Sequence, residues 1–153
     1  EFTGVTFAGE GQELDTGAKM VHLAPDTTSL ITSKSLSKAG GSSIYRSAIY
    51  IGPEAKGSKA SVSCDGLMLD NKSRSDTIPA MEIHTDECAV GHEAKIGRIS
   101  GDAIFYLMSR GISEEEARTM IVSGFANPVS KELPLEYAVE MNNLIRLEMK
   151  GNM

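Results

Sequence analysis

Tryptophan is absent from this 153-residue sequence, and its aromatic residues are only four tyrosines and four phenylalanines. Glycosidases need a pair of carboxylates that flank the scissile bond, and no pair of acids stands out as such a couple. A carbohydrate-active enzyme is therefore the weakest function class. A phosphate-binding P-loop and a G-x-S-x-G nucleophile elbow are also missing from the sequence.

Cysteine is scarce as well. Cys64 and Cys88 do not have the spacing of a disulfide framework, which is typical of a reducing compartment. The formal net charge is -6, with acids and bases mixed along the chain, so no basic stripe is available to a nucleic acid. No apolar run approaches the roughly 20 residues that cross a bilayer, and no charged-then-apolar leader stands at the start. We expect a cytoplasmic protein with neither nucleic acid nor membrane as a partner.

Residues 2–100 show short apolar alternations broken by Gly, Pro, Asp, Asn and Ser, as strands joined by tight turns do. Helical patterns do not separate them, which argues against a doubly wound sheet. A weak echo between "IGPEAKGSKA", from Ile51, and "IHTDECAVGHEA", from Ile83, indicates stacked coils, of which a parallel β-helix is the simplest. The start at Glu1, inside a strand-like pattern and without an initiator Met, leads us to expect upstream sequence. The predicted strands are Lys19–Leu23, Ser29–Ser33, Ser43–Ile51, Ala60–Leu69 and Ala80–His84.

After residue 100 the apolar period becomes helical. Start and stop signals predict helices from Ser100 to Gly111, from Ser113 to Pro128 and from Pro134 to Gly151, the second opened by a capping box of Ser113 and Glu116. We predict a helical domain over residues 101–153, following a β-helix over residues 1–100. The predicted apolar faces are Ile104, Leu107 and Met108; Ala117, Met120, Ile121, Gly124 and Phe125; and Leu135, Ala138, Met141, Ile145 and Met149.

Cys64 is the first candidate functional residue. In "SVSCDG" its side chain shares a strand face with Val62 and lies opposite Ser63 and Asp65. It is either a small core residue or, with partial exposure and a nearby cation or metal, a thiolate ligand or sulfur acceptor. The sequence alone leaves both interpretations open.

His84, Cys88 and His92 recur every four residues, with Glu93 directly after the last. Imidazole and thiolate groups suit zinc and iron. However, "HTDEC" is typical of a turn and no CxxC pair is present, which disfavours a closed structural zinc site. We interpret His84 and Cys88 as part of the wall of the last coil, and Glu93 as either a ligand or a solvated side chain.

Four long segments together resemble the carboxy-terminal part of the SufB/SufD family of iron-sulfur cluster assembly proteins, and are closer to the SufB type. They are "DTGAKMVHLAPDTTSLITSKSLSKAGGSSIYRSAIYIGPEAKGSKASVSCDGLML", "GHEAKIGRIS", "FYLMSRGISEEEARTMIVSGF" and "LPLEYAVEMNNLIRLEM". The resemblance covers nearly the whole chain.

The resemblance implies a mainly β fold, a right-handed parallel β-helix followed by a small α-helical C-terminal domain. It also implies a non-enzymatic scaffold of the SUF system that supports cluster assembly and transfer with the ABC-type ATPase SufC, which would bind residues 101–153. A second SufB/SufD-type subunit is the implied partner, in a homodimer or a heterodimer. The alternative is a structural adaptor that dimerises and binds the ATPase without holding the cluster.

The resemblance also gives roles to single residues. Cys64 matches a cysteine held to take part in building the nascent cluster, and Glu93 matches a proposed cluster-site partner, with His92 as a weaker candidate. The implied cofactor is a transient iron-sulfur cluster with Cys64 and Glu93 as metal ligands. SufB-type chains have Glu-His-Glu where this chain has Gly91-His92-Glu93, so one carboxylate is missing. Further ligands are expected outside this sequence, since a cluster site usually needs four.

Overall fold

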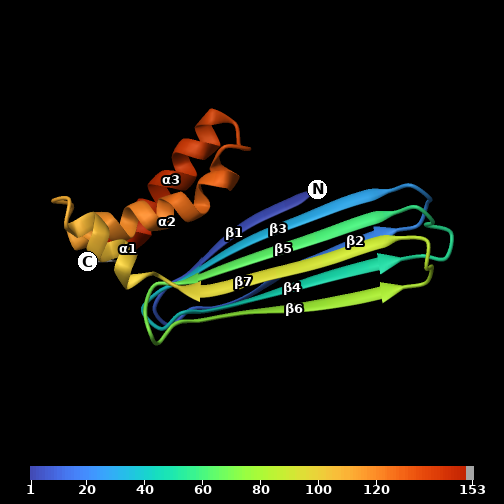
Figure 1. Cartoon of the computed structure of the whole chain (residues 1–153), viewed down its shortest axis with the longest axis horizontal. Coiled ribbons are helices and arrows are strands. Elements are labelled where there is room, and N and C mark those ends of the chain that lie inside the picture. Colours follow the sequence, from blue (N-terminus) through green and yellow to red (C-terminus); the bar gives the residue numbers. More distant parts are fainter. Residues whose placement is uncertain (151–153) are drawn as a thin grey trace. The chain divides into compact units, whose positions relative to one another are not determined.

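The computed structural model describes residues 1–150 in two compact units, the first ending at Gly97 and the second beginning at Arg98. Strands build the first unit and helices the second (Figure 1). The strands are β1 (Phe2–Ala8), β2 (Glu13–His22), β3 (Thr28–Ser37), β4 (Ser42–Ile51), β5 (Lys59–Met68), β6 (Arg74–Ile83) and β7 (Ala89–Arg98).

The strands alternate between two parallel sheets. One sheet has the order β1-β3-β5-β7 and the other β2-β4-β6. Each strand from β1 to β5 therefore pairs with the strand two places later in the chain. The chain therefore passes from one sheet to the other and back once in each coil. This is a parallel β-helix of about three turns followed by three helices, as predicted.

The sequence echo marks equivalent places in successive coils. Ile51 and Ile83 are direct partners in the β4/β6 register. The segments that follow them are the turns that lead into β5 and β7. The echo therefore identified a true structural repeat.

Most predicted strands are too short. The structure extends the first, second and fifth of them to the ten residues of β2, β3 and β6. Strands β1 and β7 were not among the predicted strands at all. The two predictions that matched to within one residue at each end, β4 and β5, are those with the clearest alternation of apolar and small side chains.

The core of the β-helix combines apolar ladders with small hydroxyl side chains. Ile31 and Val62 are stacked partners in adjacent coils, and both are almost fully buried. Burying a side chain of this size contributes about 1.5–3 kcal/mol. The Ser35 and Ser75 hydroxyls pair across the interior at 3.0 Å, which satisfies polar groups that would otherwise be costly to bury. The buried serines of these strands are Ser29, Ser33, Ser35, Ser37, Ser43, Ser47 and Ser75.

The three helices are α1 (Gly101–Met108), α2 (Glu114–Ser130) and α3 (Leu135–Lys150). The capping box of Ser113 and Glu116 is confirmed. The prediction that Pro128 closes the second helix is wrong, because α2 continues to Ser130. A proline so close to the end removes only one backbone hydrogen bond of the helix. Gly151, the expected stop of the third helix, lies outside the described residues.

The predicted apolar faces are only partly correct. Ile104, Ala117 and Ile145 are buried as expected, whereas Met120 is 52% exposed and Leu135 is 76% exposed. Among residues 1–150, no helix combines the length and apolar character needed to cross a membrane. The other buried residues of α2 are Val122, Ala126, Val129 and Ser130.

Candidate functional site

Cys64 lies on β5 and points into the β-helix. It is 4% exposed and belongs to the same core cluster as Tyr45 and Val62. Ser33 occupies the equivalent position of the preceding coil, as its direct partner in the β3/β5 register. The thiol is therefore a free cysteine held inside the wall, and the strand face predicted from the sequence is correct.

A small cavity of about 10 Å³ lies against Cys64. Hydroxyl side chains make up much of its wall. The Oη atom of Tyr45 is buried without a hydrogen-bond partner, and the Oγ1 atom of Thr77 has no partner other than the Cys64 thiol. Tyr45 and Thr77 are direct partners in the β4/β6 register, so they lie side by side on the sheet that does not contain Cys64. The lining residues are Ser33, Ser35, Tyr45, Cys64, Asp65, Gly66, Ser75, Asp76, Thr77 and Ile96.

The surroundings of Cys64 favour the protonated thiol. Burial raises its pKa above the ordinary value, the hydroxyl of Thr77 lowers it, and the negative charge of Asp65 raises it again. Burial, and then the nearby Cys64, raise the pKa of Tyr45 from 10.0 to about 12. At neutral pH the Tyr45 hydroxyl is therefore protonated and can donate a hydrogen bond, and Cys64 carries its proton.

His92 and Glu93 lie on opposite faces of β7, because successive side chains of a strand alternate. Glu93 is on the outer face, with its side chain 64% exposed and 2.9 Å from Lys95 Nζ. His92 is half-buried, and its Nε2 atom is buried without a hydrogen-bond partner. On the same face as His92, Val90 packs against the core cluster, and Ile96 lines the cavity beside Cys64. Within this chain, His92 and not Glu93 shares the interior with Cys64.

The remaining residues of the four-residue pattern lie around a turn. His84 directly follows β6, and its Nε2 atom is 2.8 Å from Glu82 Oε1 at the surface. Cys88 directly precedes β7 and donates from its Sγ atom to the Thr85 carbonyl oxygen at 3.3 Å. Within residues 1–150, no three His, Cys, Asp or Glu side chains are grouped so that they could hold a metal ion. A closed zinc site is therefore not formed by the described residues.

The β-helix is open at its last coil. Strands β6 and β7 stand at the ends of their sheets. Met81 and Ile83 continue the ladders of the buried Ile49 and Ile51, yet they are 42% and 45% exposed. Residues that face inward in the other coils are therefore uncovered here, beside an unpaired strand edge.

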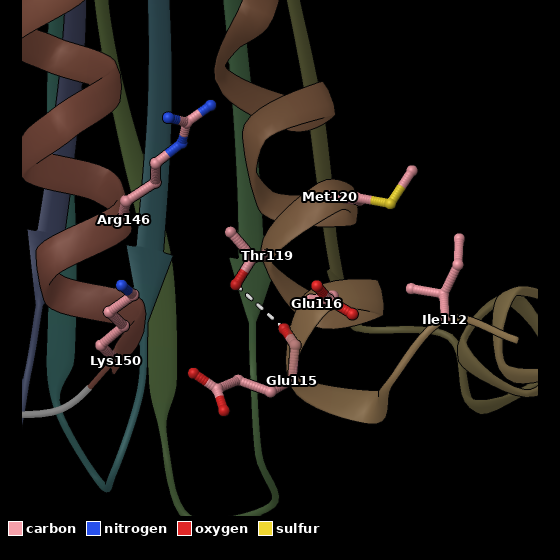
Figure 2. Close-up of a pocket in the computed structure, with 7 residues that line it drawn as sticks. All are labelled: Ile112, Glu115, Glu116, Thr119, Met120, Arg146 and Lys150. Atoms are coloured by element: carbon pink, nitrogen blue, oxygen red, sulfur yellow. Dashed lines mark hydrogen bonds between the residues drawn. The ribbon is translucent and has the colours of Figure 1, made fainter.

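The helical unit has a separate cavity, of about 460 Å³, between α2, α3 and the segment before α2. Figure 2 shows Met120 on α2, and Arg146 and Lys150 on α3. Much of the apolar surface of this unit is exposed, including Phe105 at 73% and Leu147 at 64%. The lining residues of the cavity are Ile112, Glu115, Glu116, Thr119, Met120, Arg146 and Lys150.

Tyr45 and Thr77, which line the cavity beside Cys64, were not among the candidate residues predicted from the sequence. The alternation in the predicted strand Ser43–Ile51 already places Tyr45 on one face with Ser43 and Ser47. Which residue of the other sheet lies opposite Cys64 depends on the number of residues in each coil, and this number differs from coil to coil. Cys64 is paired 31 positions after Ser33, whereas Thr77 is paired 32 positions after Tyr45.

Comparisons with known proteins agree with this architecture. A family model described as "SUF system FeS cluster assembly, SufBD core domain" matches residues 1–125. An iron-sulfur cluster assembly SufBD family protein of Staphylococcus aureus (strain USA300) is 57% identical over 148 residues, which are 97% of this chain and 32% of that protein. A protein of the same description from Staphylococcus haemolyticus (strain JCSC1435) gives the same identity and coverage. The chain thus spans about a third of the length of these relatives.

Proposed function

Because the chain belongs to the SufBD family of iron-sulfur cluster assembly proteins, we propose that it is part of the scaffold on which iron and sulfide assemble in the SUF system. Its role is to hold the growing cluster and to support its transfer with the ATPase SufC, without catalysing a reaction of its own. The cluster is the cargo of this scaffold. A reducing compartment, the cytoplasm, keeps Cys64 and Cys88 as free thiols.

The observation that carries this proposal is the position of Cys64. A buried thiol lies beside a small cavity, with the unpaired hydroxyl of Tyr45 and the hydroxyl of Thr77 in the same wall. Core packing alone explains this poorly, since unpaired buried polar groups are destabilising. We assign Cys64 as a thiolate ligand or persulfide acceptor. Further ligands come from outside this chain, because a cluster is usually held by four.

Anaerobic reconstitution with iron and sulfide tests the role of Cys64. The wild type and its Cys64→Ala variant, each with the second subunit present, are compared by bound iron, acid-labile sulfide and visible absorption. We expect the variant to lose most of its cluster. Cys88→Ala is the matched control, because Cys88 is the other free cysteine and lies in the turn before β7. Equal cluster content in the wild type and Cys64→Ala would remove Cys64 from the mechanism.

We propose that His92 and Glu93 are further ligands of the cluster, and that they would reach it from opposite faces of β7. His92 faces the interior with an unpaired Nε2 atom, so it supplies an imidazole nitrogen from the side of Cys64. Glu93 is on the outer face of an edge strand, so it reaches a cluster only at a boundary with another subunit. His92→Gln should lower cluster content with or without the second subunit, whereas Glu93→Gln should lower it only in the assembled complex.

The second subunit is proposed to be another SufB/SufD-type chain, in a homodimer or a heterodimer, that covers the open coil. The exposed inward-facing residues Met81 and Ile83 and the free edges of β6 and β7 support this placement. A charge at this surface should weaken the dimer, so Met81→Glu should shift sedimentation toward the monomer. Val21→Glu, at an outward position of β2 that is 52% exposed, is the control and should leave assembly unchanged.

The helices from α1 to α3 are proposed to bind the SufC-type ABC ATPase. Exposed apolar side chains and the cavity beside Met120 support this assignment (Figure 2), since Met adapts to irregular partner surfaces. Met120→Glu should reduce capture of the ATPase in a pull-down, and truncation after Ser100 should abolish it. Val21→Glu is again the control, and full capture by the truncated chain would contradict the assignment.

The alternative is a structural adaptor that dimerises and binds the ATPase while the cluster is held elsewhere. The 4% exposure of Cys64 and its raised pKa favour this alternative. The reconstitution and the pull-down separate the two functions. An adaptor keeps its ATPase binding and has the same cluster content with or without the Cys64 thiol.

A further inference from the structure

Two hydroxyl groups beside Cys64 are buried without a hydrogen-bond partner other than the thiol itself. Tyr45 is 4% exposed, and its Oη atom has no partner. The Oγ1 atom of Thr77 is also buried, and the Cys64 thiol is the one group with which it interacts. Native proteins pair nearly all buried polar groups, so an unpaired one calls for an explanation such as a missing ligand. Here two of them border one cavity together with a thiol.

The geometry of the cavity limits the missing group to about one atom. Its volume of about 10 Å³ corresponds to about one water-sized sphere. Cys64 borders it from β5, and Tyr45 and Thr77 border it from neighbouring positions of β4 and β6. Ile96, which is 41% exposed on the edge strand β7, also lines the cavity, so the cavity lies next to the unpaired last coil.

We propose that Tyr45 and Thr77 are positioning residues that hold the outer sulfur atom of a persulfide on Cys64, each by donating a hydrogen bond to it. This inference rests on the proposed role of Cys64 as a sulfur acceptor. A persulfide adds one sulfur atom to the thiol, which matches the size of the cavity. Its outer sulfur is anionic, and hydrogen bonds to charged acceptors are stronger than those between neutral groups.

The other charges at the cavity do not oppose an anionic sulfur strongly. Asp65 is paired with Lys34, whose Nζ atom lies 2.7 Å from Asp65 Oδ2. Asp76 is paired with Arg74, whose Nε atom lies 2.5 Å from Asp76 Oδ2. Both carboxylates therefore have a cation beside them, and the hydroxyls of Tyr45 and Thr77, which have no partner other than the Cys64 thiol, are available as donors to the sulfur.

The sulfur transfer needs no separate oxidant when the donor is itself a persulfide or a polysulfide. The Cys64 thiolate attacks the sulfane sulfur of the donor, and a new S–S bond forms to Cys64 Sγ. The S–S bond within the donor breaks, and its electron pair leaves with the shortened donor as a thiolate. The proton of the Cys64 thiol passes to solvent before the attack.

The test measures sulfur on Cys64 after exposure of the full chain to inorganic polysulfide. All proteins carry Cys88→Ser, so that Cys64 is the single thiol, and the bound sulfur is quantified by alkylation and mass spectrometry. We expect Tyr45→Phe and Thr77→Val each to lower the equilibrium constant for sulfur transfer about tenfold, as the loss of a hydrogen bond to a charged group predicts. Thr77→Ser keeps the hydroxyl and should behave like the wild type.

Thr16→Val is the matched control, because Thr16 also carries a buried, unpaired hydroxyl but does not line the cavity. It should load like the wild type, and cooperative unfolding with a midpoint no lower than that of the wild type confirms that each variant folds. Equal loading of the wild type, Tyr45→Phe and Thr77→Val would overturn this inference and leave Cys64 as an acceptor. No sulfur on wild-type Cys64 would overturn it together with the acceptor role, while failed cluster reconstitution after normal loading would count against the scaffold alone.

Discussion

Replacing Tyr45 by phenylalanine should change how the stability of the protein depends on alkaline pH. The hydroxyl is buried, and its pKa is raised from 10.0 to about 12. The unfolded chain therefore releases this proton at a lower pH than the folded chain does, so unfolding becomes more favourable as the pH rises above 10.0. Tyr45→Phe has no such proton to release.

The pKa difference sets the size of this effect. At about 1.4 kcal/mol for each pKa unit, the wild type should lose about 1.4 kcal/mol relative to Tyr45→Phe by about pH 11. The loss should be about 2.3 kcal/mol at about pH 12, and its limit above that pH is about 2.7 kcal/mol. At neutral pH the variant should be as stable as the wild type or more stable by about 1 kcal/mol, because it removes a buried hydroxyl without a partner.

Urea denaturation of both proteins from about pH 7 to about pH 11 measures this difference. Tyr106→Phe is the control, since Tyr106 is 56% exposed and is not part of the buried core. If the difference in unfolding free energy between the wild type and Tyr45→Phe stays constant across this pH range, the Tyr45 hydroxyl contacts water. A clear loss of stability in Tyr45→Phe at neutral pH would show that the hydroxyl has a partner.

Two further substitutions test the packing of each unit. Gly66→Ala should destabilise the β-helix by about 1–3 kcal/mol, because a Cβ atom there would lie 2.5 Å from Ser75 Oγ. Gly124→Ala is its control and should not destabilise the protein, because a Cβ atom at that position would have no other atom within 4 Å. Ser113→Ala removes the capping box of α2 and should cost the helical unit about 1 kcal/mol. Thermal unfolding followed by circular dichroism measures both, and an unchanged midpoint in either variant would contradict the corresponding contact.

The sequence was sufficient for the fold class because the coil repeat leaves local signals. The alternation in "SVSCDG" and the echo between Ile51 and Ile83 reflect the two geometric rules of a parallel β-helix, a side chain that turns inward at every second residue and a coil that stacks on the previous one. The capping box at Ser113 was equally readable, because it depends on residues three positions apart.

Strand lengths were underestimated because serine replaces apolar residues inside this β-helix. The prediction ended one strand at Ser33, but β3 continues to Ser37 with Ser35 and Ser37 buried. The Ser37 hydroxyl donates to the Arg74 carbonyl oxygen at 3.0 Å, a partner from another coil. A polar residue is recognised as interior only when such a partner is known.

The candidate site was predictable in part. The sequence placed Cys64 on the same strand face as Val62, which the structure confirms. The roles of His92 and Glu93 remain predictions, although alternation along β7 places His92 inside and Glu93 outside. Tyr45 and Thr77 were beyond reach, because their position opposite Cys64 depends on coil lengths that vary by a residue.

The unpaired edge of the last coil has a consequence for how reagents reach a thiol that is almost fully buried. In a stacked array each coil is stabilised by its neighbours, so a terminal coil with a neighbour on one side opens more often than an internal one. Amide hydrogens of β7 should therefore exchange with solvent faster than those of β3, which is bonded on both sides. Transient separation of β7 from β5 exposes Cys64 while the rest of the stack stays folded. The rate at which a reagent reaches the thiol is therefore set by local opening of the last coil.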